Sequence, residues 1–180
     1  KAALAGLPLG GGKSVIIGDP HTQKNEALIR AFARKIQTLN GQYYTALDIG
    51  IDVEDVLVMK EESEFTFGFP TYGTPVEYTS LGVFMGLKAA VKHQFDRDDL
   101  EGMSFSIQGV GNVGGILCRM INEEGGKLFV SDVDQEALDE MSDLYQAKQV
   151  GLNEIYHQEV AAFAPCAIGG IINDTTINQL

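Results

Sequence analysis

A glycine-rich hexapeptide in the second half of the chain has the spacing of a dinucleotide-binding turn. It matches G-x-G-x-x-G and comprises Gly109, Val110, Gly111, Asn112, Val113 and Gly114. The pattern is weak by itself, but here it follows a strand-like apolar stretch and opens an amphipathic, helix-like one. Gly109 would allow a tight turn, Gly111 would let the backbone approach a pyrophosphate, and Gly114 would permit close contact between helix and strand. The N-terminus of the helix would offer unpaired N–H groups to the phosphates.

A carboxylate after the next strand-like stretch fits the same site. Asp132, followed by Val133, stands where the adenosine ribose hydroxyls would donate hydrogen bonds to it. A carboxylate there also repels the 2′-phosphate of NADP, so the predicted cofactor is NAD. The alternative is that Asp132 only caps the helix predicted to begin a few residues later.

A second glycine-rich stretch, residues 10–12, leads directly into Lys13 and Ser14. It is not a P-loop, because that motif needs a glycine at position 7, which is leucine, and Gly6 lies one residue too far away. The glycines could instead let a substrate approach the backbone while the lysine projects into a cleft. A lysine in an apolar, partly closed site loses solvation, which lowers its pKa and suits it to act as a general base. The alternative is an exposed surface lysine.

The second half of the chain is predicted to alternate strands and helices, which indicates a doubly wound parallel sheet. The predicted strands are residues 103–108, 127–131 and 160–163, with a short piece near residue 149, and the helices are residues 79–95, 113–124 and 135–145. We therefore predict an α/β protein in which a dinucleotide-binding domain of the Rossmann type, residues 79–180, follows part of a substrate-binding and catalytic domain, residues 1–78.

The first half has weaker patterns. Strands are predicted at residues 14–17 and 42–47, and a helix at residues 24–39. Asp52 is expected to cap a further helix that runs to Glu62. Residues 65–78 are aromatic, rich in glycine and proline, and aperiodic, so they are interpreted as a linker.

Composition excludes several classes of function. The 180 residues carry a net charge of −12, which disfavours nucleic-acid binding, and no apolar run is long enough to span a membrane. The two cysteines form no C-x-x-C pair and the three histidines have no metal-ligand spacing, so no disulfide framework or metal site is expected. These features favour a cytoplasmic enzyme. The opening residue, Lys1, and the end at Leu180 suggest part of a longer polypeptide.

Four separated stretches resemble the Glu/Leu/Phe/Val dehydrogenase family, and within it the leucine dehydrogenases most of all. They are residues 1–20, residues 40–50 with Asn-Gly and Thr-Ala-Leu-Asp-Ile-Gly, residues 109–114, and residues 163–174. Their order along the chain is that of the family, and the similarity runs through essentially the whole sequence.

The resemblance implies NAD-dependent oxidative deamination of an aliphatic L-amino acid, with leucine favoured, to the 2-oxo acid and ammonia. It implies that Lys13 activates the water that attacks an imino-acid intermediate, that Lys1 binds the substrate carboxylate, and that Asp48 exchanges protons with the substrate amine. Ala46, which is small but not glycine, implies an aliphatic substrate. The set is coherent, because this reaction needs a cation for the carboxylate, a base for water and an acid–base group at nitrogen.

The same resemblance implies further cofactor contacts and an assembly. Thr79 is expected near the nicotinamide carboxamide, and the loop of Ala164, Pro165 and Cys166 is expected close to the nicotinamide. Family members form oligomers, so a homo-oligomer is expected for the full-length protein. Because segments that complete the family's substrate pocket are absent from this sequence, we expect these 180 residues to be inactive alone.

Other functions stay open at this point. A phenylalanine- or valine-preferring member of the family is the nearest alternative. A non-catalytic NAD-binding module would keep the fold without the chemistry, although the presence of Lys1, Lys13 and Asp48 together speaks against it. A hydroxyacid dehydrogenase would need an imidazole base, and no histidine stands in a supporting motif.

Overall fold

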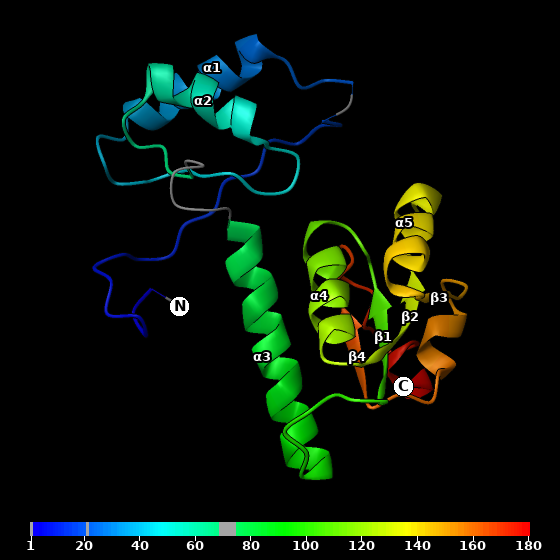
Figure 1. Cartoon of the computed structure of the whole chain (residues 1–180). Coiled ribbons are helices and arrows are strands. Elements are labelled where there is room, and N and C mark those ends of the chain that lie inside the picture. The colour runs from blue at the N-terminus through cyan, green and yellow to red at the C-terminus, as the bar shows by residue number, and fades with distance from the viewer. Residues whose placement is uncertain (1, 21, 69–74) are drawn as a thin grey trace. The chain divides into compact units, whose positions relative to one another are not determined.

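The chain divides into two compact units, Lys1–Thr74 and Pro75–Leu180. The computed structural model describes residues 2–20, 22–68 and 75–180 (Figure 1). The division falls before Pro75, whereas the sequence suggested a boundary after residue 78. The difference arises because helix α3, Pro75–Phe95, begins four residues earlier than its apolar pattern indicated. Proline is favoured in the first turn of a helix, where its missing N–H costs nothing.

The second unit is built on a parallel sheet with strand order β3-β2-β1-β4. The strands are β1 Ser104–Gln108, β2 Lys127–Ser131, β3 Lys148–Gln149 and β4 Ala162–Pro165. Helix α4, Asn112–Glu123, connects β1 to β2, and α5, Gln135–Tyr145, connects β2 to β3. Two short 3-10 helices, η2 Glu154–His157 and η3 Ile177–Gln179, follow. Because the chain leaves β3 and returns to the other side of β1, the order reverses between β1 and β4, and the predicted doubly wound α/β fold is confirmed.

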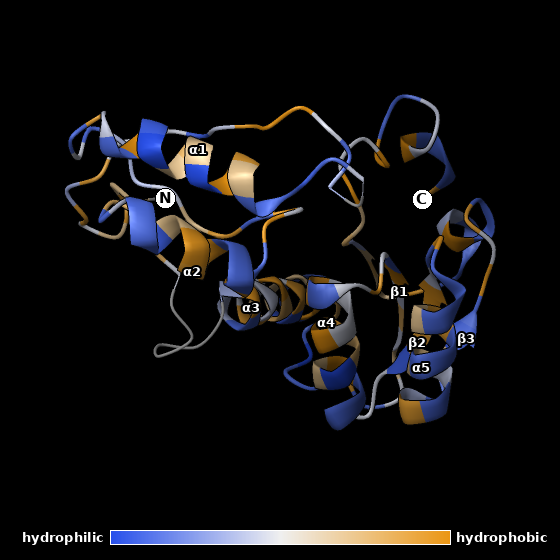
Figure 2. Ribbon diagram, turned by 90° about the horizontal axis from the view of Figure 1, so that it is seen from above, coloured by the Kyte–Doolittle hydropathy of each residue, from blue (hydrophilic) through white to orange (hydrophobic). Residues whose placement is uncertain are grey.

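Strand alternation explains how the sheet presents one apolar face to the helices. Phe105 and Ile107 of β1 are fully buried with Val130 of β2, and they join a core that includes Leu117 and Cys118 of α4. Hydrophilic and apolar residues alternate along α4 and α5, as a helix with one face on a sheet requires (Figure 2).

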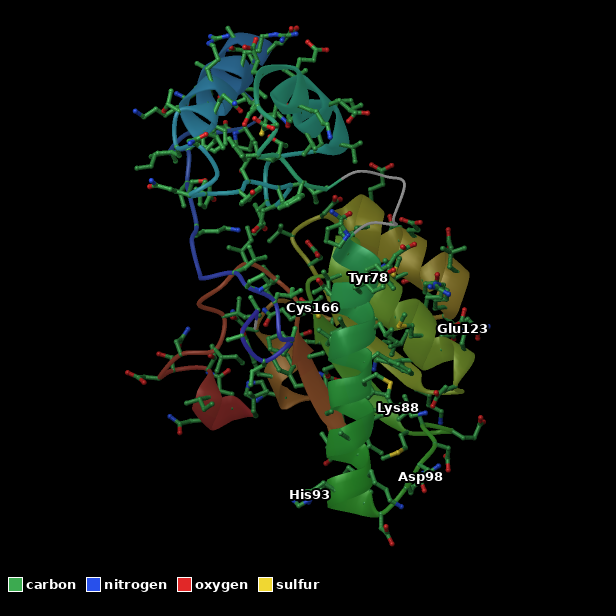
Figure 3. The ribbon with its side chains drawn as sticks, turned by 90° about the vertical axis from the view of Figure 1, so that its left-hand side faces the viewer. Tyr78, Lys88, His93, Asp98, Glu123 and Cys166 are labelled. Atoms are coloured by element: carbon green, nitrogen blue, oxygen red, sulfur yellow. The ribbon has the colours of Figure 1, made fainter. Side chains whose placement is uncertain are left out.

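Helix α3 packs alongside α4 within the same core, where Phe84, Leu87 and Val91 are buried. Lys88 projects from α3 (Figure 3). It forms an ion pair with Glu124, which directly follows α4, at 2.6 Å between Nζ and Oε1. The residues that cluster in this core therefore come from both the helix that precedes the sheet and the sheet's own crossover helices.

The first unit consists of two packed helices and long irregular segments. Helix α1, Glu26–Gln37, is capped by Asn25, and α2, Val53–Glu62, is capped by Asp52 as predicted. Ile29 and Ala33 of α1 are buried against Met59 of α2.

The strands predicted at residues 14–17 and 42–47 are not formed. The described residues of this unit contain one isolated bridge, between Thr45 and Thr66, and no strand. Val15 and Ile17 are 78% and 97% exposed. A β-branched sequence makes a strand only where a neighbour accepts its backbone hydrogen bonds, and residues 14–17 have no such neighbour in the described part of the chain.

No helix in the described ranges is both long enough and apolar enough to cross a membrane.

Candidate functional site

The glycine-rich turn between β1 and α4 has no room for a side chain at two of its glycines. Gly109 has φ +91°, and a Cβ there would collide with the backbone of Ala167. A Cβ at Gly114 would collide with the carbonyl oxygen of Gly109. In contrast, a Cβ at Gly111 would meet no atom within 4 Å. The protein's own packing therefore requires the first and third glycines but leaves open space at the second.

The start of α4 differs from the starts of three other helices. The side chains of Asn25, Asp52 and Asp134 accept hydrogen bonds from the first turns of α1, α2 and α5. The N-cap of α4 is Gly111, and no side chain caps this helix. Free backbone N–H groups and the positive end of the helix dipole favour an anion at this position. Together with the open space at Gly111, they fit the pyrophosphate of a dinucleotide.

Asp132, which follows β2, is hydrogen-bonded to the glycine turn. Its Oδ2 accepts a hydrogen bond from the N–H of Val110 at 2.7 Å, and its Oδ1 accepts bonds from Val133 and Asp134 at 2.7 and 3.0 Å. The helix-cap alternative for Asp132 is wrong, because Asp134 is the N-cap of α5. A carboxylate offers about four acceptor positions, so a position remains for a ribose hydroxyl. Val133 is 86% exposed beside it.

The structure brings the loop after β4 against the same turn. The N–H of Cys166 donates to the carbonyl of Gln108 at 2.8 Å, which continues the β1–β4 pairing to the residue before Gly109. Ala164 is buried and Pro165 is exposed. Burial raises the pKa of the Cys166 thiol and raises that of Cys118 to about 12. Both cysteines are free thiols, which stay protonated at neutral pH.

Thr79 lies on α3, and its hydroxyl donates to the carbonyl of Pro75 at 2.8 Å. The adjacent Ser80 was not anticipated from the sequence. It is fully buried, and its hydroxyl lies 2.9 Å from the carbonyl oxygen of Val76 and 3.3 Å from that of Val113. Ser80 thus links α3 to the first turn of α4, a role that a small polar residue in a helix does not reveal by its spacing.

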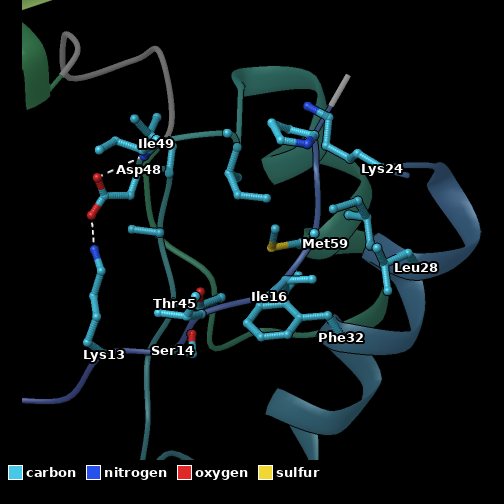
Figure 4. A pocket seen from close by; sticks show the side chains of 18 of the residues that line it. Lys13, Ser14, Ile16, Lys24, Leu28, Phe32, Thr45, Asp48, Ile49 and Met59 are labelled. Atoms are coloured by element: carbon cyan, nitrogen blue, oxygen red, sulfur yellow. Dashed lines mark hydrogen bonds and ion pairs between the residues drawn. The ribbon is translucent and has the colours of Figure 1, made fainter. Parts of the chain in front are cut away.

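Lys13 and Asp48 form an ion pair in the first unit (Figure 4). Their side chains are 65% and 54% exposed, so the described residues do not enclose Lys13 in the closed apolar site suggested by the sequence. The pair nevertheless joins two residues far apart in the chain, to both of which the resemblance assigned catalytic roles. Neither is an isolated surface group.

A pocket of about 940 Å³ opens beside this ion pair. Lys13, Asp48 and the exposed Ala46 contribute to its lining, and much of the rest is apolar, including Ile16, Leu28, Ile29, Phe32 and Met59 (Figure 4). A charged pair beside an apolar lining suits a zwitterion with an aliphatic side chain. Lys1, the expected carboxylate ligand, lies outside the described residues.

Tyr43 supports the segment that carries Lys13. Its hydroxyl lies 2.9 Å from that of Ser14, and a Cβ on Gly12 would lie 3.0 Å from two of its ring carbons. The sequence pattern predicted only that Tyr43 belongs to a strand at residues 42–47. Its place beside Lys13 follows from the tertiary fold. Among the described residues, no group of three or more His, Cys, Asp and Glu side chains could hold a metal ion.

Two models of one protein family match the chain. Residues 1–65 match the Glu/Leu/Phe/Val dehydrogenase dimerisation domain, and residues 73–138 match Glutamate/Leucine/Phenylalanine/Valine dehydrogenase. The chain belongs to the Glu/Leu/Phe/Val dehydrogenase family. The second match contains the glycine turn and Asp132, and the first contains Lys13 and Asp48.

Individual members of the Glu/Leu/Phe/Val dehydrogenase family are similar over nearly the whole chain. A leucine dehydrogenase from Geobacillus stearothermophilus is 50% identical, and a phenylalanine dehydrogenase from Bacillus thermotolerans is 40% identical, each over 100% of this chain and 50% of the relative. The crystal structure of L-tryptophan dehydrogenase from Nostoc punctiforme has a TM-score of 0.74 and 44% identity, covering 99% of this chain and 51% of that one. The chain thus spans about half the length of the curated relatives it matches.

Proposed function

We propose that the full-length protein is an NAD-dependent dehydrogenase that deaminates an aliphatic L-amino acid oxidatively, with leucine as the favoured substrate. The Lys13–Asp48 ion pair at the edge of a largely apolar pocket is the observation that carries the proposal. It supplies a base and an acid–base group in one place, within a chain of the Glu/Leu/Phe/Val dehydrogenase family.

The overall reaction converts the amino acid, water and NAD⁺ into the 2-oxo acid, ammonium, NADH and a proton. Asp48 takes a proton from the substrate ammonium, which leaves a lone pair on nitrogen. Bound NAD⁺ would accept the hydride that leaves Cα. Lys13, once its ammonium has released a proton to solvent, removes a proton from the water that attacks the resulting iminium carbon. Asp48 returns a proton to nitrogen, the C–N bond breaks, and the departing ammonia takes the hydroxyl proton and leaves as ammonium while the carbonyl forms. Lys1 is assigned to the substrate carboxylate, which needs a cation.

The cofactor assignment depends on the second unit. We assign the pyrophosphate to the uncapped N-terminus of α4 at Gly111, and the adenosine ribose to Asp132. A carboxylate at residue 132 repels a 2′-phosphate and favours NAD over NADP. Thr79 and the segment of Ala164, Pro165 and Cys166, which ends β4 and begins the loop after it, are assigned to the nicotinamide.

Substrate preference and assembly are part of the same proposal. Apolar pocket residues and Ala46 support an aliphatic side chain, and the leucine dehydrogenase at 50% identity supports leucine. The phenylalanine dehydrogenase at 40% identity makes phenylalanine the competing substrate. The match of residues 1–65 to a dimerisation domain supports a homo-oligomer, and two free thiols support a reducing, cytoplasmic location.

The test is turnover by the full-length protein with NAD⁺ and L-leucine, L-valine or L-phenylalanine, followed by NADH absorbance. We expect the highest kcat/KM with leucine. Lys13→Ala should lower kcat by a factor of about 100 to 10,000, the usual contribution of a general base, while the Kd for NADH stays unchanged. If the native protein binds NADH but turns over no amino acid, it is a non-catalytic NAD-binding module and the proposal is wrong.

A further inference from the structure

Lys24 joins the two segments of the first unit that carry the Lys13–Asp48 pair. Its ammonium donates to Oδ2 of Asp52 at 2.8 Å and to Oδ2 of Asp55 at 2.6 Å. The side chain of Lys24 is 24% exposed and that of Asp55 is 14% exposed, so this contact is shielded more than the Lys13–Asp48 pair.

Two sets of ion pairs join these segments, in the same order along both. Lys13 pairs with Asp48, and Lys24 reaches Asp52 and Asp55. The segment that begins at Lys13 and ends at Lys24 is therefore joined to residues 48–55 near both of its ends. The Lys24 contact is the one that attaches them to the regular structure of α2.

The turn that presents Asp48 is short and internally bonded. Oδ1 of Asp48 accepts from the N–H of Ile49 at 2.8 Å, and its carbonyl accepts from the N–H of Ile51 at 2.9 Å. Gly50, with φ +78°, completes this turn, and Asp52 follows as the N-cap of α2. The turn that presents Asp48 therefore leads directly into the α2 N-cap, to which Lys24 donates a hydrogen bond.

We propose that Lys24 is a positioning residue, which holds the turn at residues 48–51 against the segment of Lys13 so that the carboxylate of Asp48 meets the Lys13 ammonium. The inference rests on the proposed function, because it assigns these two groups to proton transfer. Chemical steps of this kind lose rate steeply when groups are misplaced by about 1 Å.

Lys24 remains charged under working conditions. Hydrogen bonds with Asp52 and Asp55 raise the pKa of Lys24, and the bond from Lys24 holds the pKa of Asp52 below its usual range. The α2 capping box forms between Asp52 and Asp55 themselves, with backbone bonds of 2.9 and 3.0 Å. Loss of Lys24 should therefore leave α2 capped and folded while it releases the turn from residues 13–24.

The experiment compares full-length Lys24→Met and Lys24→Arg with Lys88→Met as the matched control. Lys88 forms a similarly shielded ion pair with Glu124, and both residues belong to the second unit. For Lys24→Met we expect kcat with leucine to fall about tenfold or more, while the Kd for NADH stays unchanged. Lys24→Arg should restore most of kcat, and Lys88→Met should leave kcat unchanged.

Hydrogen exchange separates this inference from the proposed function. In Lys24→Met the amides of Ile49 and Ile51 should exchange faster than in the native protein, while those of α2 keep their protection. Unchanged exchange at both amides, or unchanged kcat in a folded variant, overturns the role of Lys24. If the native protein has no turnover, the proposed function fails, and the exchange result still decides whether Lys24 holds the turn.

Discussion

The two glycine-rich stretches of this chain, residues 109–114 and residues 10–12, look alike as sequence but have different physical roles. In the first, Gly109 and Gly114 stand where any side chain would collide with backbone. In the second, a Cβ at Gly10 or Gly11 would meet nothing within 4 Å, and one at Gly12 would meet only the ring of Tyr43. The turn at residues 109–114 is thus fixed by backbone packing, at Gly114 against Gly109 and at Gly109 against Ala167. The position of Lys13 depends instead on the side chains of Tyr43 and Asp48, which are distant in sequence.

The two units also differ in where their candidate site residues lie relative to the hydrophobic core. The second unit has a core of buried side chains from three helices and three strands, and Val110 of its glycine turn belongs to that core. The first unit has a small core at α1 and α2, and its chemical groups lie on irregular segments outside it. Substitutions in the turn should therefore lower the stability of the fold, whereas substitutions near Lys13 should lower kcat.

The largest expected effect is that of Gly114→Ala in the full-length protein. Its Cβ would overlap the carbonyl oxygen of Gly109, and backbone atoms on both sides must move. We expect the free energy of unfolding to fall by about 3 kcal/mol, near the upper end for an overpacked core, with loss of NADH binding. Urea denaturation followed by circular dichroism measures it.

Gly12→Ala is the matched change in the other stretch. The added Cβ meets only the flexible Tyr43 side chain, so the free energy of unfolding should fall by less than about 1 kcal/mol. Equal destabilisation by the two substitutions would contradict the contrast between the stretches.

The effect expected for a substitution of Asp132 is smaller than that of Gly114→Ala. Asp132→Asn removes the charge that would bind the ribose hydroxyls, so the Kd for NADH should rise about tenfold to a hundredfold, and discrimination against NADPH should weaken. Asp134→Ala is the control, because Asp134 caps α5 through Glu136 and Ala137 at 3.0 and 3.4 Å. It should cost about 1 kcal/mol of stability and leave NADH affinity unchanged. Fluorescence titration of NADH and NADPH distinguishes the two variants.

Sequence patterns predicted the second unit well because its elements are determined locally. The predicted bounds of residues 127–131 and 135–145 agree with β2 and α5, and Gly109–Gly114 lies between a strand and a helix as its motif requires. The α2 cap at Asp52 was also predicted correctly, because capping depends on neighbouring residues.

The rest depended on contacts between distant residues. The β-branched residues at positions 15–17 gave no means to tell whether a partner strand was present. Residue spacing could not pair Lys13 with Asp48, and only resemblance to a family suggested that they act together. Tyr43, Ser80 and Lys24 carried no motif at all, and their roles became visible only when the fold placed them beside Ser14, Val113 and Asp52.

The most direct test of the central claim is titration of NADH into full-length Gly111→Val, with Gly10→Val as the control. An added Cβ would meet no atom within 4 Å at either position, so both variants should fold. If the pyrophosphate lies against Gly111, the added side chain should raise the Kd for NADH by about a hundredfold or more, whereas Gly10→Val should not change it. Native NADH affinity in a folded Gly111→Val variant would contradict the proposed cofactor site.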